Sequence, residues 1–283
     1  MAYKAEKLAD AVGIEITGID LREADTETGA ELHRHFVENG VLCVRDQSLE
    51  PHEFLAAARF FGEPIVQIYG QFNMPDHPEI GLLTSEDTDS AGTGERKIRG
   101  TSWHTDASYF EQPPKATVLH ALIVPPDGGD TEFLSTAAAY DALPEETKQR
   151  INPLQAVHNY QSSRSPRKLI KRSEDQVERF PEGILHPVAR RNPDTDRRAI
   201  YLNPIRVECI DGYERAESDA LLDDLTAHCL KPEFQYRHKW RVRDLLIWDN
   251  RGALHTATPY DMDRHRRLIY RTSVRGEVPI GPQ

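Results

Sequence analysis

The chain has 283 residues, of which 38% are hydrophobic and 29% are charged, a composition typical of a folded water-soluble protein. Its formal net charge of −11 repels nucleic acid phosphates. This charge argues against a DNA or RNA partner, but not against a small anion held by local arginines. There is no run of 18 apolar residues and no signal-peptide pattern at the N-terminus, so we expect no membrane span and a cytoplasmic location.

The three cysteines, Cys43, Cys209 and Cys229, are widely spaced and contain no CxxC pair. This pattern indicates neither a disulfide framework nor a thiolate zinc site. We expect three reduced, structural cysteines.

The first 62 residues predict two strands and two helices. Residues 11–19 and 40–46 are strand-like, and 26–39 has a helical pattern that ends at Gly40. Residues 51–62 begin with a proline and end with a glycine, as a short helix does.

From about residue 64 onward, short strands separated by turns dominate the pattern. Two amphipathic helices are expected at 135–150 and 216–229. The charged stretch 162–180 predicts either a loop or helical lid over a site or a solvated surface excursion. The pattern therefore predicts one mainly β domain over 1–283, a double antiparallel sheet with peripheral helices. The expected strands are 79–83, 116–124, 199–203, 244–250 and 268–274.

The segment SWHTDASY at 102–109 contains the first candidate metal ligands. On a strand, His104 and Asp106 are two residues apart and project from the same face. An imidazole and a carboxylate on one face form two thirds of a facial metal triad. His-x-Asp also arises by chance in a chain with 12 histidines, so a hydrogen-bonded surface pair is the alternative.

His255 follows the apolar strand that ends in WDN, at a place where we expect the chain to turn. A lone histidine there is usually a polar loop residue, but it can supply the second imidazole that the His-x-Asp pair lacks. Two histidines and one carboxylate leave three metal positions open. This geometry suits Fe(II) oxygen chemistry, in which O₂ and a bidentate cosubstrate bind together.

The basic segment RHRRLIYRTSV at 264–274 places Arg267 and Arg271 four residues apart, on one face of a strand. Buried arginines need anionic partners, and their planar guanidinium matches carboxylates and sulfonates. A solvated edge strand is the alternative. Thr131, in the turn GGDT at 128–131, offers a hydroxyl that could help to bind a carboxylate.

Taken in order along the chain, these segments resemble the TauD/TfdA family of 2-oxoglutarate-dependent dioxygenases. Each motif alone is loose, but the ordered set is specific and covers nearly the whole chain. The matching segments are EITGIDLRE (15–23), LAAARFFGEP (55–64), WHTDASYFEQPP (103–114), PPDGGDTEF (125–133), AAYDALP (138–144), ILHP (184–187), WDNRGALH (248–255) and RRLIYR (266–271).

The resemblance implies a double-stranded β-helix, or jelly-roll, core with Fe(II) at one mouth. By similarity, the iron ligands are His104, Asp106 and His255. The cosubstrates would be 2-oxoglutarate and O₂, and a C–H bond of the substrate would be hydroxylated with release of succinate and CO₂.

The resemblance also implies that Arg267, assisted by Thr131, binds the distal carboxylate of 2-oxoglutarate. The spacing from His255 is one residue longer than in the taurine enzymes, which leaves Arg266 as an alternative; the strand phase favours Arg267. Arg271 corresponds to the position at which relatives bind the anionic group of the substrate.

The substrate pocket differs from that of the taurine enzymes. Their asparagine four residues before the first iron histidine is Gly100 here, and the place of a second histidine is taken by Val66. We therefore expect a small carboxylate, sulfonate or sulfate with an apolar or aromatic body, such as an aryloxyalkanoate, rather than taurine. The predicted substrate-binding residues besides Arg271 are Val66, Tyr69, Ala107, Tyr109 and Tyr160.

Three alternatives remain at this point: a taurine or alkylsulfonate dioxygenase, a zinc hydrolase that uses the same triad, and a silent jelly-roll binding module. A complete triad argues against the silent module, and the cosubstrate arginine would have no role in a hydrolase. By analogy with the family, we expect a homo-oligomer.

Overall fold

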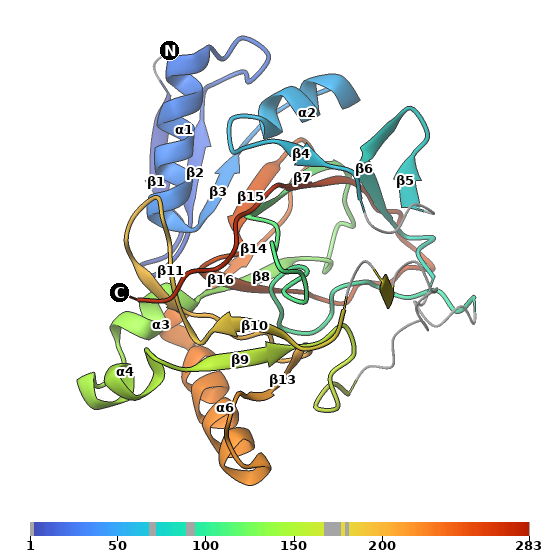
Figure 1. Cartoon of the computed structure of the whole chain (residues 1–283). Helices are drawn as coiled ribbons and strands as arrows, with labels where there is room; N and C mark the ends of the chain where they lie inside the picture. Colours follow the sequence, from blue (N-terminus) through green and yellow to red (C-terminus); the bar gives the residue numbers. More distant parts are fainter. Residues whose placement is uncertain (1–2, 68–71, 89–93, 167–176, 179–180, 283) are drawn as a thin grey trace.

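A nine-stranded sheet forms the centre of the molecule (Figure 1). The computed structural model describes residues 3–67, 72–88, 94–166, 177–178 and 181–282. Neighbouring strands are antiparallel except for the parallel pair at 14–17 and 41–44. In spatial order the strands are β1 (Lys4–Lys7), β2 (Ile14–Thr17), β3 (Val41–Val44), β15 (Leu245–Asp249), β7 (Ala116–Ile123), β17 (Leu268–Val274), β6 (His77–Thr84) and β5 (Asn73–Met74), while β4 (Pro64–Ile65) pairs with β17.

A smaller sheet faces the central one, and the two enclose an apolar layer. Its strands lie in the order β14 (Gln235–His238), β8 (Thr131–Ser135) and β16 (Ala253–Ala257). Phe133 on β8 packs with residues of β7, β15 and β17, and these contacts join the two sheets. The buried residues of this layer include Leu119, Phe133, Leu246, Trp248 and Ile269.

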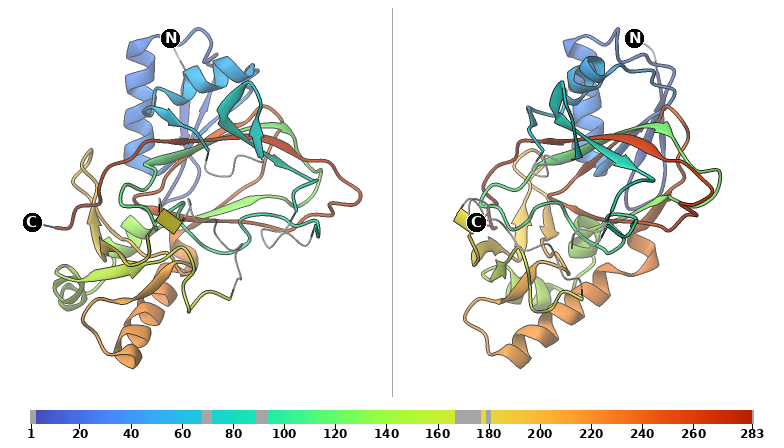
Figure 2. Two further views of the ribbon diagram at one scale, coloured as in Figure 1. Left: turned by 45° about the vertical axis from the view of Figure 1, so that its right-hand side comes forward. Right: turned by 90° about the vertical axis from the view of Figure 1, so that its right-hand side faces the viewer.

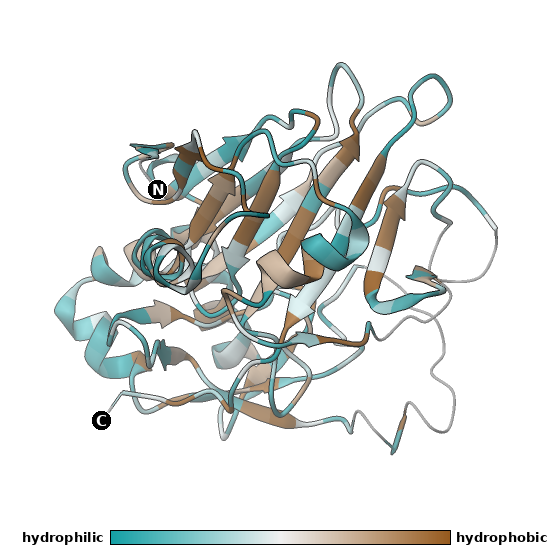
Figure 3. Cartoon of the chain, turned by 90° about the horizontal axis from the view of Figure 1, so that it is seen from above, coloured by the Kyte–Doolittle hydropathy of each residue, from teal (hydrophilic) through white to brown (hydrophobic). Residues whose placement is uncertain are grey.

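Two helices cover the central sheet near the N-terminus. They are α1 (Thr26–Asn39) and α2 (Pro51–Ala58). Asp25 caps α1 by accepting a hydrogen bond from the amide of Thr28, and Gly40 ends the helix at φ 72°. Seen from above, apolar residues run along the strands that lie beneath these helices (Figure 3). Burial of one sheet face under two amphipathic helices stabilises this half of the molecule.

The other helices pack with short strands below the small sheet (Figure 2). None of the described helices combines the length and apolarity needed to cross a bilayer. The elements are α3 (Thr136–Asp141), α4 (Glu145–Ile151), β9 (Gln155–His158), β10 (Ile184–Pro187), β11 (Ala189–Arg191), β12 (Arg198–Ile200), β13 (Val207–Ile210), α6 (Arg215–Cys229) and the 3₁₀ turn η2 (Pro232–Phe234).

The mainly β architecture predicted from the sequence is confirmed. The helix expected over 135–150 is instead two helices, because Pro144 cannot continue the first one and caps the second. His255 was expected in a turn but lies within β16, where the chain returns to pair with β8. Of the charged stretch 162–180, only residues 162–166 and 177–178 fall within the described residues.

Candidate active site

Two backbone elements bring the predicted metal ligands together. His104 forms an isolated antiparallel bridge with His255 of β16, with N–O distances of 3.0 and 2.8 Å. The strand expected around His104 is limited to this bridge, because the chain turns directly afterwards. Asp106 lies in that turn, and Ala107 takes the left-handed conformation at φ 47°. The turn, rather than strand alternation, places the carboxylate beside the imidazoles.

The three side chains form an open cluster that has room between them for a metal ion. Their potential ligand atoms all lie within 4.8 Å of one another. Nε2 of His104 is 3.9 Å from Oδ1 of Asp106, and Nε2 of His255 is 4.0 Å from Oδ2. These separations are too long for hydrogen bonds. Nδ1 of His104 lies 2.6 Å from the carbonyl oxygen of Ser102, which fixes the tautomer that leaves the Nε2 lone pair for a metal.

The protonation states of the cluster also suit a metal. Burial alone would raise the pKa of Asp106, but Arg271 at 3.0 Å and the two histidines hold it well below its usual range. Burial, together with the neighbouring His104, lowers the pKa of His255 well below the ordinary histidine value. The site therefore offers a carboxylate and a neutral imidazole, the forms in which these residues bind metals.

A hydrogen-bonded chain behind the cluster orients Asp106. Thr117 of β7 donates its hydroxyl to Oδ2 of Asp106 at 2.6 Å. Asn250 donates to the Thr117 hydroxyl at 3.1 Å and accepts from the Trp248 indole at 3.0 Å. Each of these groups except Asp106 is almost completely buried, so the carboxylate is held by a rigid part of the core.

The cluster opens into a cavity of about 250 Å³ between the sheets. Arg267, Arg271 and Thr131, the residues predicted to bind the cosubstrate and the substrate, all line this cavity. Arg267 is 7% exposed, and its Nε has no hydrogen-bond partner among the described residues. Burial lowers the pKa of this guanidinium, but an arginine remains charged at neutral pH. Arg266 is exposed and does not line the cavity.

The turn GGDT shapes the wall of the cavity beside Arg267. Gly128 and Gly129 both have positive φ, at 70° and 68°. A Cβ on Gly128 would lie 2.4 Å from the carbonyl oxygen of Pro259, so no larger residue fits there. The turn leads directly into Thr131, whose hydroxyl accepts a hydrogen bond from the Trp240 indole at 3.1 Å.

Arg271 lies close to the candidate metal ligands. Its two terminal nitrogens lie 3.0 Å from Oδ2 of Asp106 and 2.6 Å from Oε1 of Gln67. Gln67, which no motif in the sequence indicates as a site residue, also lines the cavity and is 9% exposed. The pair of contacts holds the Arg271 guanidinium between the metal cluster and the rest of the pocket.

The structure brings only some of the predicted substrate residues to the cavity. Val66, which is 58% exposed, lines it together with Ala107 and the buried Tyr109. Tyr160 is buried behind Tyr109 at a ring-centroid distance of 5.1 Å and is not part of the cavity wall. Tyr69 lies outside the described residues.

Arg206, which was not among the predicted site residues, also lines the cavity. It lies in the segment NPIRVECI, where no periodicity or repeated motif distinguishes it from a surface arginine. Only the fold places its guanidinium beside Tyr109.

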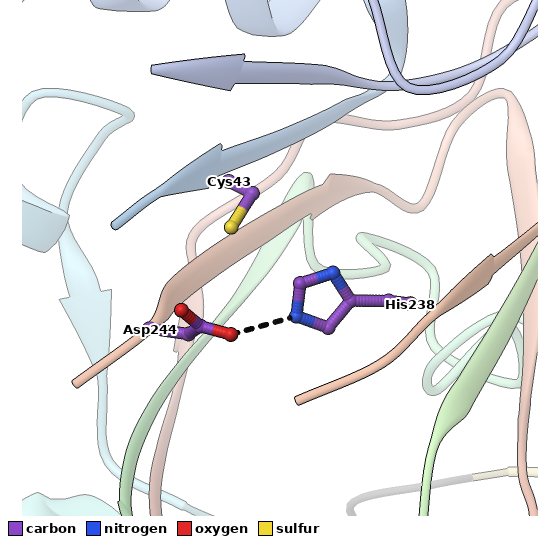
Figure 4. Close-up of side chains that lie close together, drawn as sticks. All are labelled: Cys43, His238 and Asp244. Carbon is purple, nitrogen blue, oxygen red and sulfur yellow. Dashed lines mark hydrogen bonds and ion pairs between the residues drawn. The ribbon is translucent and has the colours of Figure 1, made fainter. Parts of the chain in front are cut away.

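Cys43, His238 and Asp244 form a second cluster of ligand-type side chains, away from the cavity (Figure 4). Oδ2 of Asp244 already accepts from Arg45, from His238 and from the amide of Arg241, at 2.5, 3.2 and 2.7 Å. Burial raises the pKa of the Cys43 thiol well above its usual value, which opposes the thiolate form that a metal requires. We interpret this cluster as a structural network in the core.

The chain is similar throughout to known dioxygenases. Residues 4–273 match the model of the family described as "Taurine catabolism dioxygenase TauD, TfdA family". The chain is 34% identical over 279 residues to an alpha-ketoglutarate-dependent 2,4-dichlorophenoxyacetate dioxygenase of Cupriavidus pinatubonensis, covering 95% of this chain and 96% of that protein. It is 32% identical over 283 residues to an alpha-ketoglutarate-dependent sulfate ester dioxygenase of Pseudomonas putida, covering 97% and 90%.

Solved structures show the same fold. A taurine dioxygenase from Burkholderia xenovorans superposes with a TM-score of 0.82 at 29% identity, covering 99% of this chain and 93% of that one. The structure of AAD-2 in complex with Mn(II) and N-oxalylglycine also gives 0.82, at 28% identity and 99% coverage of both chains. The chain therefore belongs to the TauD/TfdA family and is a 2-oxoglutarate-dependent dioxygenase.

Proposed function

We propose that His104, Asp106 and His255 bind Fe(II) and that the enzyme hydroxylates an aliphatic C–H bond of a small organic anion. The observation that carries this proposal is that one cavity contains an open two-histidine, one-carboxylate cluster and a buried arginine, Arg267, with no carboxylate partner among the described residues. The donor set is the one that non-haem iron oxygenases use, since it leaves positions for O₂ and a chelating cosubstrate. Fe(II), with O₂ and 2-oxoglutarate, would supply the oxidising equivalent for hydroxylation.

Arg267 is the residue that would bind the distal carboxylate of 2-oxoglutarate. A buried guanidinium without an anionic partner is costly, and a bidentate carboxylate offsets that cost. Thr131 lies on the same wall and its hydroxyl can donate to the same carboxylate. In the similar AAD-2 structure, the bound N-oxalylglycine is an isostere of 2-oxoglutarate, which supports a cosubstrate site of this type.

Arg271 would bind an anionic group of the substrate. It can do so once Asp106 coordinates a metal, because the carboxylate charge is then shared with the cation. The apolar Val66, Ala107 and Tyr109 on the same cavity favour an apolar or aromatic body. Gly100, which also lines the cavity, provides no side chain for a taurine amine, so taurine is disfavoured. Relatives that act on 2,4-dichlorophenoxyacetate and on sulfate esters are consistent with such a substrate class.

The test is anaerobic addition of Fe(II) and 2-oxoglutarate to the metal-free protein. We expect the weak visible charge-transfer band of the chelate in the wild type, its loss in His104→Ala and its weakening in Arg267→Ala. Arg266→Ala is the matched control, because this neighbouring arginine is exposed and should leave the band unchanged.

Turnover is then followed as succinate release with O₂ and a panel of aryloxy acids, sulfonates and sulfates. A band that appears normally in His104→Ala would contradict the metal assignment. A band that is lost in Arg266→Ala but retained in Arg267→Ala would reassign the cosubstrate arginine. No band in the wild type would favour the zinc hydrolase or the silent binding module instead.

A further inference from the structure

Arg206 is held rigidly at the cavity wall by two aromatic rings. It lies in the connection between β12 and β13, and its guanidinium carbon is 4.9 Å from the ring centroid of Tyr109 and 5.0 Å from that of Tyr160. It also donates a hydrogen bond to the backbone carbonyl of Tyr160. Cation–π contact with two rings that are nearly perpendicular to each other restrains the guanidinium without neutralising its charge.

The charge of Arg206 has no carboxylate counterpart among the described residues. The other cavity arginines differ in this respect. Arg99 pairs with Asp87 at 2.7 Å, Arg271 pairs with Asp106, and Arg267 is assigned above to 2-oxoglutarate. Arg206 is therefore a positioned cation for which the proposed reaction so far provides no anion.

The net charge of the cavity wall also indicates that the substrate site can bind a further anionic group. Four arginines and two aspartates line it among the described residues, which gives a surplus of two positive charges. Fe(II) has a charge of about +2 and 2-oxoglutarate a charge of about −2, so the binding of both leaves the positive surplus of the cavity wall unchanged. The charged residues concerned are Asp87, Arg99, Asp106, Arg206, Arg267 and Arg271.

We propose that Arg206 is a second anion-binding residue of the substrate site and that the substrate is a dianion with two separate acidic groups. One group would bind Arg271 and the other Arg206. This inference rests on the proposed function and sharpens its substrate class. Carboxylates and sulfonates both suit the two-nitrogen edge of a guanidinium, and a partly enclosed cavity strengthens each pairing. Tyr109 leaves an aromatic wall beside Arg206 for the body that joins the two groups.

The experiment compares matched pairs of probes that differ by one acidic group. The pairs are 3-sulfopropanoate with propane-1-sulfonate, and 4-carboxyphenoxyacetate with phenoxyacetate. Each is titrated anaerobically into the enzyme with Fe(II) and 2-oxoglutarate, and binding is followed by the shift of the visible band. We expect at least one dianion to bind at least about tenfold more tightly than its monoanionic partner, as one additional charge-assisted pair predicts.

Substitutions assign this preference to Arg206. In Arg206→Met the ratio within a pair should fall to about one while the monoanion binds as before, and Arg206→Lys should restore part of the preference. A normal band in Arg206→Met shows that the metal and cosubstrate sites are intact. Equal affinities within both pairs, no binding by either dianion, or an unchanged ratio in Arg206→Met would overturn the inference and leave the oxygenase proposal standing. If no band forms in the wild-type protein, the result would instead contradict the proposed function itself.

Discussion

The part of the chain that the structure describes contains two clusters of three ligand-type side chains, and only one of these has the surroundings of a working metal centre. In both clusters the potential ligand atoms lie within 4.8 Å of one another. His104, Asp106 and His255 line a cavity, and their imidazole Nε2 atoms lie at least 3.9 Å from the carboxylate. Cys43 and Asp244 of the other cluster are sealed within the core.

The difference shows that charge compensation matters as much as ligand type. The carboxylate of Asp244 is already neutralised by Arg45, at 2.5 Å, and accepts two further hydrogen bonds. Asp106 also has an arginine nearby, since Arg271 lies 3.0 Å from its Oδ2 and Thr117 donates to the same oxygen, but it lies at the cavity with two imidazoles beside it. The site that can take up a metal and an anion is distinguished by its access to a cavity and by Arg267, which has no carboxylate partner in the described parts of the chain.

The largest expected effect separates the two clusters by their metal content. We expect about one equivalent of Co(II) per chain in the wild type, almost complete loss of binding in His255→Ala, and no change in Cys43→Ala. The absorption spectrum should contain no thiolate-to-cobalt charge-transfer band, because Cys43 stays protonated in the core. A second equivalent that disappears in Cys43→Ala would show that the sealed cluster binds metal after all.

Arg45→Met should destabilise the protein without affecting metal binding. Arg45 bridges Glu15 and Asp244 and is 7% exposed, so its removal leaves a buried carboxylate without its cation. The expected loss in the free energy of unfolding is about 3–5 kcal/mol, measured by urea denaturation. Arg22→Met is the control, because its ion pair with Asp20 is exposed and screened by solvent, so its loss should have little effect on stability. Equal effects of the two substitutions would mean that Arg45 has no special structural role.

The elements that were predicted correctly are those with a clear hydrophobic pattern in the sequence. The helix at 26–39 and the strands β7, β15 and β17 agree closely with their predicted ranges. The short strands β8, β14 and β16 were missed, because polar residues interrupt each of them and they are recognisable only from their pairing with one another, whereas the equally short β3 and β15 are almost entirely apolar. The same short sheet carries His255, and this is why the residue was expected in a turn.

The candidate site was predictable to the extent that its residues belong to local motifs. His104, Asp106 and the two arginines near 267–271 recur in a recognisable order along the chain. Gln67 and Arg206 could not be predicted from the sequence, because their significance depends on the side chains that they contact across the cavity. A linear sequence cannot show that an arginine lacks a carboxylate partner, since such partners come from distant segments.

Thr117→Val tests whether the support of Asp106 contributes to metal affinity. The substitution keeps the shape of the side chain but removes the hydroxyl that donates to Asp106 and accepts from Asn250. We expect metal affinity to fall about 10–100-fold, measured by competition with a chelating dye. Thr272→Val is the matched control on the adjacent β17, because its buried hydroxyl has no hydrogen-bond partner among the described residues. Unchanged affinity in Thr117→Val would show that coordination alone orients the carboxylate.

The smallest expected effect is a pH dependence in the sealed cluster. Burial lowers the pKa of His238, and its hydrogen bond to Asp244 offsets this only in part. The unfolded chain therefore binds the proton more readily, so this residue favours folding above about pH 6.5 and loses that contribution as the pH falls towards its folded pKa. The slope from one histidine is at most about 1.4 kcal/mol per pH unit. His238→Gln can keep a donor to Asp244 but does not titrate, so the difference in unfolding free energy between wild type and variant should change with pH in this window. A constant difference would mean that the imidazole already carries its proton in the core, as a partner of Asp244 that resembles Arg45.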